Sequence, residues 1–225
     1  MNSINFKRLK SKNDLYLFLK NFENKNKLIN KKDFKNYIKN KKPYNIEIND
    51  CYQLYKTIYN KKRLSVLEFG SGYSTLVISK ALYDLKKKYF DTAKNLRRGK
   101  VFELNFIETS NKFKNITLNR IPNFIKKEIK INYIVTSSNM AKINNKICTL
   151  YKKLPNCNPD FIYLDGPHIG DTKGNISGIN FSKNYDYTPM CGDPIILENI
   201  LLPGAIIYFD GRINNFLFIK NNLQR

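Results

Sequence analysis

The chain has 225 residues, with 40 Lys and Arg against 18 Asp and Glu, and a formal net charge of +22. Hydrophobic residues make up 42% of it, which excludes wholesale disorder and suffices for a buried core. The longest apolar runs fall far short of the roughly 18 residues of a membrane-spanning helix, and the N-terminus lacks the apolar stretch of a signal peptide. Four cysteines without a CxxC pair and a single histidine argue against a zinc site or a disulfide framework. We therefore expect a soluble, cytoplasmic protein.

The positive charge admits two interpretations. It is typical of proteins that bind nucleic acid or an anionic surface. However, 33 of the 40 basic residues are Lys and only 7 are Arg, whereas nucleic-acid sites favour the planar guanidinium. Residues 1–62 carry 16 basic and 5 acidic groups, and residues 160–225 carry 5 basic and 7 acidic groups. We favour the interpretation that the overall composition has drifted toward Lys and that these side chains form a solvated surface. A nucleic-acid partner stays an alternative.

The first 60 residues predict helices with Lys-rich surfaces. Apolar residues recur at helical spacing in three stretches, and Pro43 separates the second from the third. The three apolar faces consist of Leu15, Leu17, Phe18, Leu19 and Phe22; of Phe34, Tyr37 and Ile38; and of Cys51, Leu54, Tyr55 and Ile58. We expect residues 1–46 to form a helical extension and residues 47–225 to form the main domain.

From residue 64 onward, short apolar runs alternate with helical stretches. The five runs are residues 64–69, 101–107, 131–135, 161–164 and 205–209. Strands without polar alternation, separated by helices, are typical of a parallel sheet that is covered on both faces. A helix is expected from Thr75 to about Lys88. The fold class is therefore α/β.

A glycine-rich turn follows the first predicted strand, in the segment VLEFGSGYSTLVISKAL. Glu68 ends the strand, Gly70 and Gly72 form the turn, and Ser74 can cap the next helix. Such a strand, turn and helix is typical of a nucleotide-type site at the carboxyl ends of the strands. A dinucleotide fingerprint needs a third glycine at position 75, where Thr stands, and the Gly-Lys-Ser/Thr of a P-loop is absent. A structural turn that binds nothing is the alternative.

The pattern Glu-x-Gly-x-Gly-x-Ser resembles motif I of class I S-adenosylmethionine-dependent methyltransferases. The resemblance implies a Rossmann-like parallel sheet with helices on both faces and S-adenosyl-L-methionine as the cofactor. It also implies that the motif holds the methionine part and the ribose, through Glu68, Phe69, Gly70, Ser71, Gly72, Tyr73 and Ser74. An acid suits this cofactor because its amino group and its sulfonium are both positive, whereas a pyrophosphate would be repelled.

The resemblance continues at the ends of the later strands and covers residues 47–220. Glu108 ends the second strand, 40 residues after Glu68, where the family has an acid that accepts hydrogen bonds from both ribose hydroxyls. Ser137 follows the third strand, and the resemblance places it near the adenine. Asp165 follows the fourth strand, where the family's acid lines the methyl-transfer pocket, so the resemblance implies both a catalytic and a cofactor-binding role for it. A Leu-Pro-Gly turn before the fifth strand is also common in these enzymes.

The acceptor side of the site involves Asp165 and Asp210, which end strands that should be neighbours and so face one cleft. Some O-methyltransferases of this fold hold Mg²⁺ with acids at these two strand ends. Here Gly211 and Arg212 follow the second Asp instead of a further ligand, so we expect no metal and keep Mg²⁺ as an alternative. His168 is a candidate general base, or a loop histidine without a role. Arg212 is a candidate to bind a carboxylate or phosphate of the substrate.

Two stretches of the second half bear on the pocket and on solution behaviour. Residues 166–193 hold five of the ten glycines, and we expect them to cover the substrate pocket as a lid, with a tolerated insertion as the alternative. A complete sheet of this family has a final antiparallel hairpin, whereas residues 214–225 predict one helix. We therefore expect a domain without that hairpin. The fifth strand would then be an exposed apolar edge that favours self-association.

The predicted function is S-adenosylmethionine-dependent methyl transfer to a small-molecule or glycan-type acceptor, on oxygen. The motif Asp/Asn-Pro-Pro-aromatic, associated with methylation of amino groups on bases, is absent, and Asp-Gly-Pro-His stands there. One alternative is a non-catalytic binding module in which the basic helices of residues 1–62 contact RNA or an anionic surface. Another, an NAD-dependent oxidoreductase, is disfavoured by Glu68 and by the missing third glycine.

Overall fold

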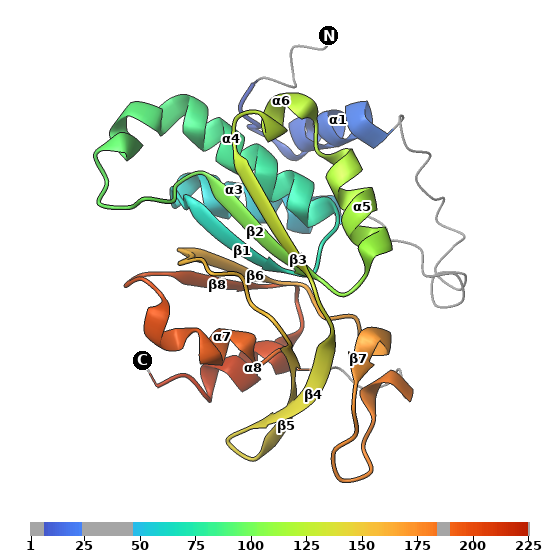
Figure 1. Ribbon diagram of the computed structural model, residues 1–225. Helices are drawn as coiled ribbons and strands as arrows, with labels where there is room; N and C mark the ends of the chain where they lie inside the picture. Colours follow the sequence, from blue (N-terminus) through green and yellow to red (C-terminus); the bar gives the residue numbers. More distant parts are fainter. Residues whose placement is uncertain (1–6, 24–46, 184–189, 225) are drawn as a thin grey trace.

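Five parallel strands form the central sheet of the computed structural model, which describes residues 7–23, 47–183 and 190–224 (Figure 1). The order of the strands across the sheet is β3-β2-β1-β6-β8. Their bounds are β1 (Ser65–Phe69), β2 (Glu103–Glu108), β3 (Lys130–Val135), β6 (Phe161–Leu164) and β8 (Ile206–Phe209). Each of the five predicted apolar runs is one of these strands. The order is that of a Rossmann-like α/β fold. The chain adds β2 and β3 on one side of β1 and then adds β6 and β8 on the other side.

The central strand β1 is buried on both faces, which explains its continuous apolar sequence. Because side chains alternate along a strand, Val66 and Glu68 point to one face and Leu67 and Phe69 to the other. Val66 belongs to one hydrophobic core, and Leu67 and Phe69 belong to a second core. The sheet therefore separates two packed layers.

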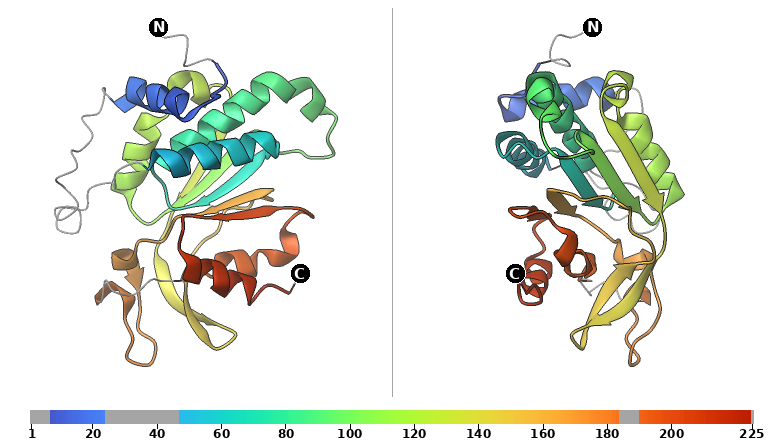
Figure 2. Two further views of the ribbon diagram at one scale, coloured as in Figure 1. Left: turned by 180° about the vertical axis from the view of Figure 1, so that it is seen from behind. Right: turned by 60° about the vertical axis from the view of Figure 1, so that its left-hand side comes forward.

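Helices cover both faces of the sheet (Figures 1 and 2). The first face carries α1 (Lys12–Glu23), α3 (Ile48–Asn60), α4 (Tyr73–Lys94), α5 (Asn111–Arg120) and α6 (Asn123–Lys126). The second face carries α7 (Asp193–Ile196) and α8 (Ile213–Lys220), joined through η5 (Glu198–Ile200) and β8. The predicted fold class, a Rossmann-like sheet flanked by helices on both faces, is confirmed. No helix among the described residues is long and apolar enough to cross a membrane.

A hairpin without a clear signal in the sequence lies between the third and fourth strands of the sheet. It consists of β4 (Ser138–Ile143) and β5 (Lys146–Tyr151), which pair antiparallel, and β4 also pairs with β7 (Thr172–Lys173). Its turn is Asn144-Asn145, where φ is +50° and +61°. Asn tolerates this left-handed conformation, which a two-residue hairpin turn requires. The hairpin covers part of the second face in place of a helix.

The predicted helices differ from the observed ones in their bounds and in one buried face. The helix predicted from Thr75 to about Lys88 is α4, which begins at Tyr73 and continues to Lys94 past a non-helical Tyr89. The predicted C-terminal helix is α8, which ends at Lys220. Leu15, Phe18 and Leu19 of α1 are buried as predicted, but Leu17 is 40% exposed because it lies on the outer side of the helix. The side chain of Phe22 and residues Phe34, Tyr37 and Ile38 lie outside the described residues.

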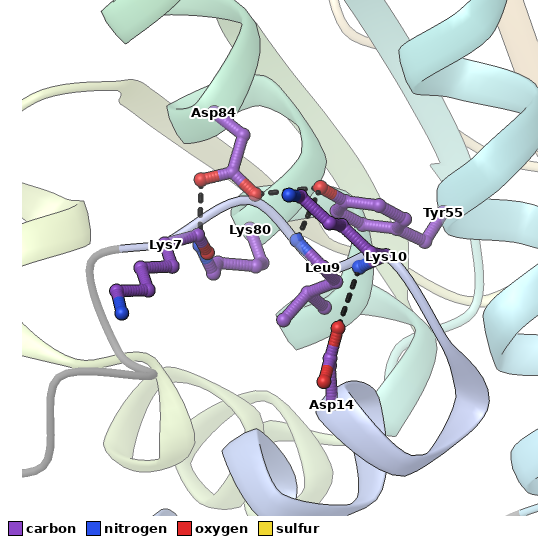
Figure 3. Close-up of polar contacts among 7 residues, drawn as sticks. All are labelled: Lys7, Leu9, Lys10, Asp14, Tyr55, Lys80 and Asp84. Atoms are coloured by element: carbon purple, nitrogen blue, oxygen red, sulfur yellow. Dashed lines mark hydrogen bonds and ion pairs between the residues drawn. The ribbon is translucent and has the colours of Figure 1, made fainter.

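The segment before α1 is held against the main domain by buried polar contacts (Figure 3). Lys80 and Asp84 of α4 form an ion pair of 2.5 Å, and Lys80 Nζ also donates to Lys7 O at 2.8 Å. Tyr55 of α3 donates through its hydroxyl to Asp84 Oδ2 at 2.7 Å and accepts from Leu9 N at 3.1 Å. Leu9 itself is buried in the core of the first face. Residues 7–23 thus share a core with the sheet, and the division between residues 46 and 47 stays a prediction.

Candidate functional site

Glu68 lies in β1 at the point where the glycine turn begins, and its side chain is fully buried. Ser74 Oγ donates to Glu68 Oε1 at 2.5 Å, while Oε2 has no hydrogen-bond partner among the described residues. Burial raises the pKa of Glu68 to about 8, against the lowering effect of the Ser74 hydrogen bond. Ser74 was predicted to cap α4. Its hydroxyl instead donates to Glu68, because the helix already begins at Tyr73, after Gly72.

The two glycines of the turn have different physical roles. Gly70 has φ +98°, and a Cβ there would lie 3.0 Å from Asp165 O, so the packing of β1 against β6 requires glycine. Gly70 N also donates to Ile107 O at 2.8 Å, which ties the turn to β2. A Cβ on Gly72 would meet no protein atom within 4 Å. The first turn of α4 is therefore open beside Gly72, as a ligand that approaches the backbone would require.

Glu108 ends β2 beside this turn and is nearly buried. Ser71 Oγ donates to Glu108 Oε2 at 2.6 Å, and the backbone nitrogens of Thr109 and Ser110 donate to Oε1 at 2.7 and 3.1 Å. Burial raises the pKa of Glu108, and these hydrogen bonds oppose the shift. The carboxylate is therefore fixed in one orientation next to the glycine turn.

An open cleft of about 600 Å³ extends from Thr109 along the carboxyl ends of β2 and β3. Ser137, which the sequence predicts near the adenine, lies in its wall together with Thr136. The opposite wall comes from the stretch predicted to act as a lid, through η3 (Ile169–Asp171) and β7. Thr109 Oγ1 donates to Asp171 Oδ2 at 3.0 Å across the two walls. The described part of the stretch, residues 166–183, thus lines the cleft, and its role as a moving lid stays a prediction.

Three residues of this cleft are missing from the sequence prediction. Thr109 and Asp171 join the two walls, and Thr172 Oγ1 is buried without a hydrogen-bond partner among the described residues. Thr109 directly follows Glu108, so its position alone could have indicated it. No spacing pattern in the sequence distinguishes Asp171 or Thr172, because β7 pairs with the unanticipated strand β4.

Asp165 and Asp210 follow the neighbouring strands β6 and β8, as predicted. Asp210 N donates to Leu164 O at 3.2 Å, which aligns the two strand ends. The Asp165 side chain is exposed to solvent at the end of its strand. Partial removal from water by the surrounding protein, together with the nearby Asp210 carboxylate, raises the pKa of Asp165, and Arg212 opposes the shift. Among residues 7–23, 47–183 and 190–224, no group of three His, Cys, Asp or Glu side chains is arranged to hold a metal ion.

Arg212 and His168 both make contacts within the chain. Arg212 Nε lies 2.9 Å from Asp210 Oδ1 and 2.8 Å from Oδ2, so this guanidinium pairs with the second acid. His168 Nδ1 accepts from Gly170 N at 3.2 Å and caps η3. The neutral ring that makes this bond carries its proton on Nε2. The general-base role of His168 and the substrate-binding role of Arg212 stay predictions.

Phe69 and Tyr73 are the remaining predicted cofactor-binding residues. The Phe69 side chain is buried in the core of the second face, with its ring 5.7 Å from that of Tyr151. Only its backbone therefore lies at the turn, and Phe69 O accepts from Asp165 N at 3.0 Å. The Tyr73 ring lies 4.1 Å below the guanidinium of Arg120, which comes from α5. The motif is thus held by packing on both sides of the turn.

Comparisons with known proteins add a likeness among solved structures. No family model matches the chain, and no curated protein matches it. Among solved structures, the chain is similar to an O-methyltransferase from Bacillus cereus, determined in complex with SAH. The two are 14% identical, the likeness covers 91% of this chain and 77% of the other, and the TM-score is 0.43.

Proposed function

We propose that this chain transfers a methyl group from S-adenosylmethionine to a small-molecule or glycan-type acceptor, on oxygen. The observation that carries the proposal is the placement of two buried acids, Glu68 and Glu108, at the ends of adjacent strands and on either side of a glycine turn. The Rossmann-like fold puts these strand ends where α/β proteins bind their ligands.

The residues fit this cofactor by three features of the structure. Glu68 Oε2 is a buried carboxylate oxygen without a partner in the described chain, and a positive amino group or sulfonium would supply one. Gly72 leaves the first turn of α4 open. The cleft beside Thr109 and Ser137 has about 600 Å³, which is in the usual range for a pocket that binds a small ligand.

Each acid has a distinct binding role in this proposal. Glu68 attracts the positive groups of the methionine part in its ionised form, which the approach of these groups would favour. Glu108 accepts a hydrogen bond from a ribose hydroxyl at Oε2, which keeps a second lone pair beside the bond from Ser71, whereas Oε1 already accepts from two backbone nitrogens. Ser137 and Thr172 surround the base in the cleft. When bound, the cofactor supplies an activated methyl group.

In this proposal the methyl acceptor enters the site beside the exposed side chain of Asp165. A carboxylate whose pKa is raised is a better proton acceptor near neutral pH than an ordinary one. Asp165 therefore accepts the proton of the acceptor hydroxyl, and Asp210, held by Arg212, keeps a second carboxylate beside it. The main contribution of the chain is to hold the acceptor oxygen in line with the methyl group.

Self-association through β8 is the second part of the proposal. Among the described residues β8 pairs with β6 alone, and Ile196, Ile200 and Ile213, which flank β8 in the sequence, are exposed. A long apolar edge favours pairing with another chain. Light scattering after size exclusion tests this, and a monodisperse monomer across a range of concentrations contradicts it.

The activity is tested by measuring the release of S-adenosylhomocysteine in the presence of defined acceptors. The panel contains phenolic and sugar hydroxyls, carboxylic acids, and matched amines. We expect turnover with an oxygen acceptor, and a loss of at least tenfold in kcat for Asp165→Asn with little change in S-adenosylmethionine binding. Turnover with the amines alone would overturn the assignment to oxygen, and no turnover by a protein that binds the cofactor would overturn the acceptor class.

A further inference from the structure

The charges of this protein are segregated along the direction of the strands. The carboxyl ends of the strands carry acids, including Glu68, Glu108, Asp165 and Asp210. The opposite end of the sheet carries the last turns of α4 and the loop that returns to β2 (Figure 1). In this stretch, residues 86–100, the sequence has seven basic residues and one acid. Lys86 and Lys87 pair with Glu128, Lys94 with Asp91 and Arg98 with Asp160, so the excess positive charge at this end of the sheet comes from Lys88, Arg97 and Lys100.

We propose that this end of the molecule binds single-stranded nucleic acid. We call the surface the amino-end patch and define it by Lys62, Lys88, Lys94, Arg97, Arg98 and Lys100 around the aromatic rings of Tyr89 and Phe90. The proposal is independent of the proposed methyl transfer. Apart from Lys62, its residues also lie outside residues 1–62, whose basic helices are the alternative RNA-binding surface.

Two adjacent aromatic side chains lie at the centre of the amino-end patch. Tyr89 departs from helical geometry, with φ −122° and ψ 17°, so α4 bends there. Phe90 is 44% exposed, and Tyr89 is half-buried against the core of the first face. Exposed rings beside positive charges are the elements on which unpaired bases stack, with little dependence on sequence.

Lysines from the loop after α3 and from the end of α4 lie over the two rings. Lys62 Nζ lies 5.1 Å from the centroid of the Tyr89 ring, and it comes from the loop after α3. Lys94 Nζ lies 4.3 Å from the centroid of Phe90. These ammonium groups bring positive charge against both rings, and the phosphates of a bound strand would be attracted to it.

A hollow of about 530 Å³ adjoins the patch and is lined in part by Arg97, Arg98 and Lys100. Lys100 Nζ donates to Asn156 O at 3.0 Å, and Arg98 pairs with Asp160 at 2.5 Å, so these two side chains fix the wall of the hollow. Arg97 is exposed at its rim. A guanidinium in this position suits a phosphate, which it can bind through two parallel hydrogen bonds.

The shape of the patch favours a nucleic acid over a membrane surface. A membrane-binding face is a protruding apolar surface that enters the headgroup layer. Here Arg97, Arg98 and Lys100 line part of a hollow, and lysines lie beside the aromatic rings. A flexible polyanion can follow such a surface, and a flat bilayer cannot fill the hollow.

The test is fluorescence anisotropy of a labelled 12-nucleotide oligouridine with the full chain, as a function of salt. The variant Lys88→Ala/Arg97→Ala removes two charges of the patch, and Lys142→Ala/Lys146→Ala removes two exposed charges from the β4–β5 hairpin as a matched control. We expect the patch variant to bind at least tenfold more weakly, with the slope of log K against log salt reduced by about 1.4, and the control to change affinity by less than twofold. Phe90→Ala should weaken binding by roughly fivefold or more through lost stacking.

Three results would overturn the proposal. Equal losses in the patch variant and the hairpin control would show that overall charge alone attracts the oligonucleotide. Unchanged affinity in Phe90→Ala would remove the stacking role that distinguishes this surface. Tighter binding to vesicles of phosphatidylcholine and phosphatidylserine than to the oligonucleotide, lost in the patch variant, would assign the patch to a membrane instead. Thermal unfolding monitored by circular dichroism confirms that each variant is folded.

Discussion

Ser71 Oγ donates a hydrogen bond of 2.6 Å to Glu108 Oε2, and this bond links the turn after β1 to the end of β2. The two residues lie 37 positions apart in the sequence, so the parallel pairing of β1 and β2 brings them together. Thr117 of α5 contacts Ser71 Oγ at 3.3 Å and closes the group. The orientation of the second acid thus depends on a residue of the glycine turn.

Ser71→Ala is therefore expected to weaken binding of S-adenosylhomocysteine by roughly tenfold, because a hydrogen bond to a carboxylate is lost while the two backbone donors remain. Isothermal titration calorimetry measures the effect. Ser79→Ala is the control, since the Ser79 hydroxyl is buried and bonds Thr75 O within α4 and not Glu108. Equal losses in both variants would mean that Ser71 acts through general stability and not through Glu108.

Glu68→Gln is expected to change the pH dependence of stability in a defined direction. The pKa of Glu68 is raised to about 8 by burial, against an ordinary value of 4.5. The folded state then holds a proton that the unfolded state releases, so this contribution to stability is full below about pH 4.5 and is lost as the pH rises through 8. Between these two pH values, the free energy of unfolding of the variant should rise relative to that of the wild type by at most about 1.4 kcal/mol per pH unit.

Urea unfolding at pH 5, 7 and 9 measures this difference. The same variant should lose affinity for S-adenosylhomocysteine at pH 9, where the wild-type carboxylate is ionised and attracts the amino group. A stability difference that is constant with pH would contradict the buried, protonated state of Glu68.

Alanine at the two glycines of the turn should separate folding from binding. Gly70→Ala forces a Cβ against Asp165 O at 3.0 Å with φ at +98°, so we expect a loss of about 2 kcal/mol or more in the free energy of unfolding. Gly72→Ala meets no protein atom and should change stability by less than about 1 kcal/mol. It should still reduce binding of S-adenosylhomocysteine at least tenfold, because its methyl group occupies the open space beside α4. Thermal unfolding and calorimetry on both variants check this, and full binding by Gly72→Ala would show that the ligand does not approach there.

Lys80→Met should destabilise the protein by about 3–5 kcal/mol, because it leaves Asp84 buried without its positive partner. The double variant Lys80→Met/Asp84→Asn should recover much of this loss, since no buried charge remains. Lys94→Met removes an exposed pair with Asp91 and should cost less than about 1 kcal/mol. Hydrogen exchange should also become faster at residues 7–10 in the single variant. Similar losses for Lys80→Met and Lys94→Met would contradict the role of the buried pair.

The sequence predicts the parallel sheet well because its strands are buried on both faces and read as continuous apolar runs. The acids at the ends of these strands were predicted for the same reason, since a polar residue after such a run marks the strand end. Asp165 and Asp210 could be placed side by side from the expected strand order alone, and the structure confirms that their strands are neighbours.

The β4–β5 hairpin and the buried lysine were not predicted, for physical reasons that differ. The strands SNMAKI and KICTLY are short and mixed in polarity, and only the Asn144-Asn145 turn marks them as a hairpin. Lys80 is fully buried although Lys residues elsewhere in the chain suggest a solvated surface. Its partner Asp84 lies one helical turn away, but burial of the pair depends on α3 and on residues 7–10, which are distant in sequence.

The central claim is that the carboxyl ends of β1 and β2 bind S-adenosylmethionine, and calorimetric titration of the full chain with S-adenosylhomocysteine tests it most directly. The account predicts one site per chain with a Kd of roughly 1–100 µM, in the usual range for enzyme ligands, and a loss of at least tenfold in Glu108→Gln. No heat of binding up to roughly 1 mM ligand, by a protein that unfolds cooperatively, would contradict it.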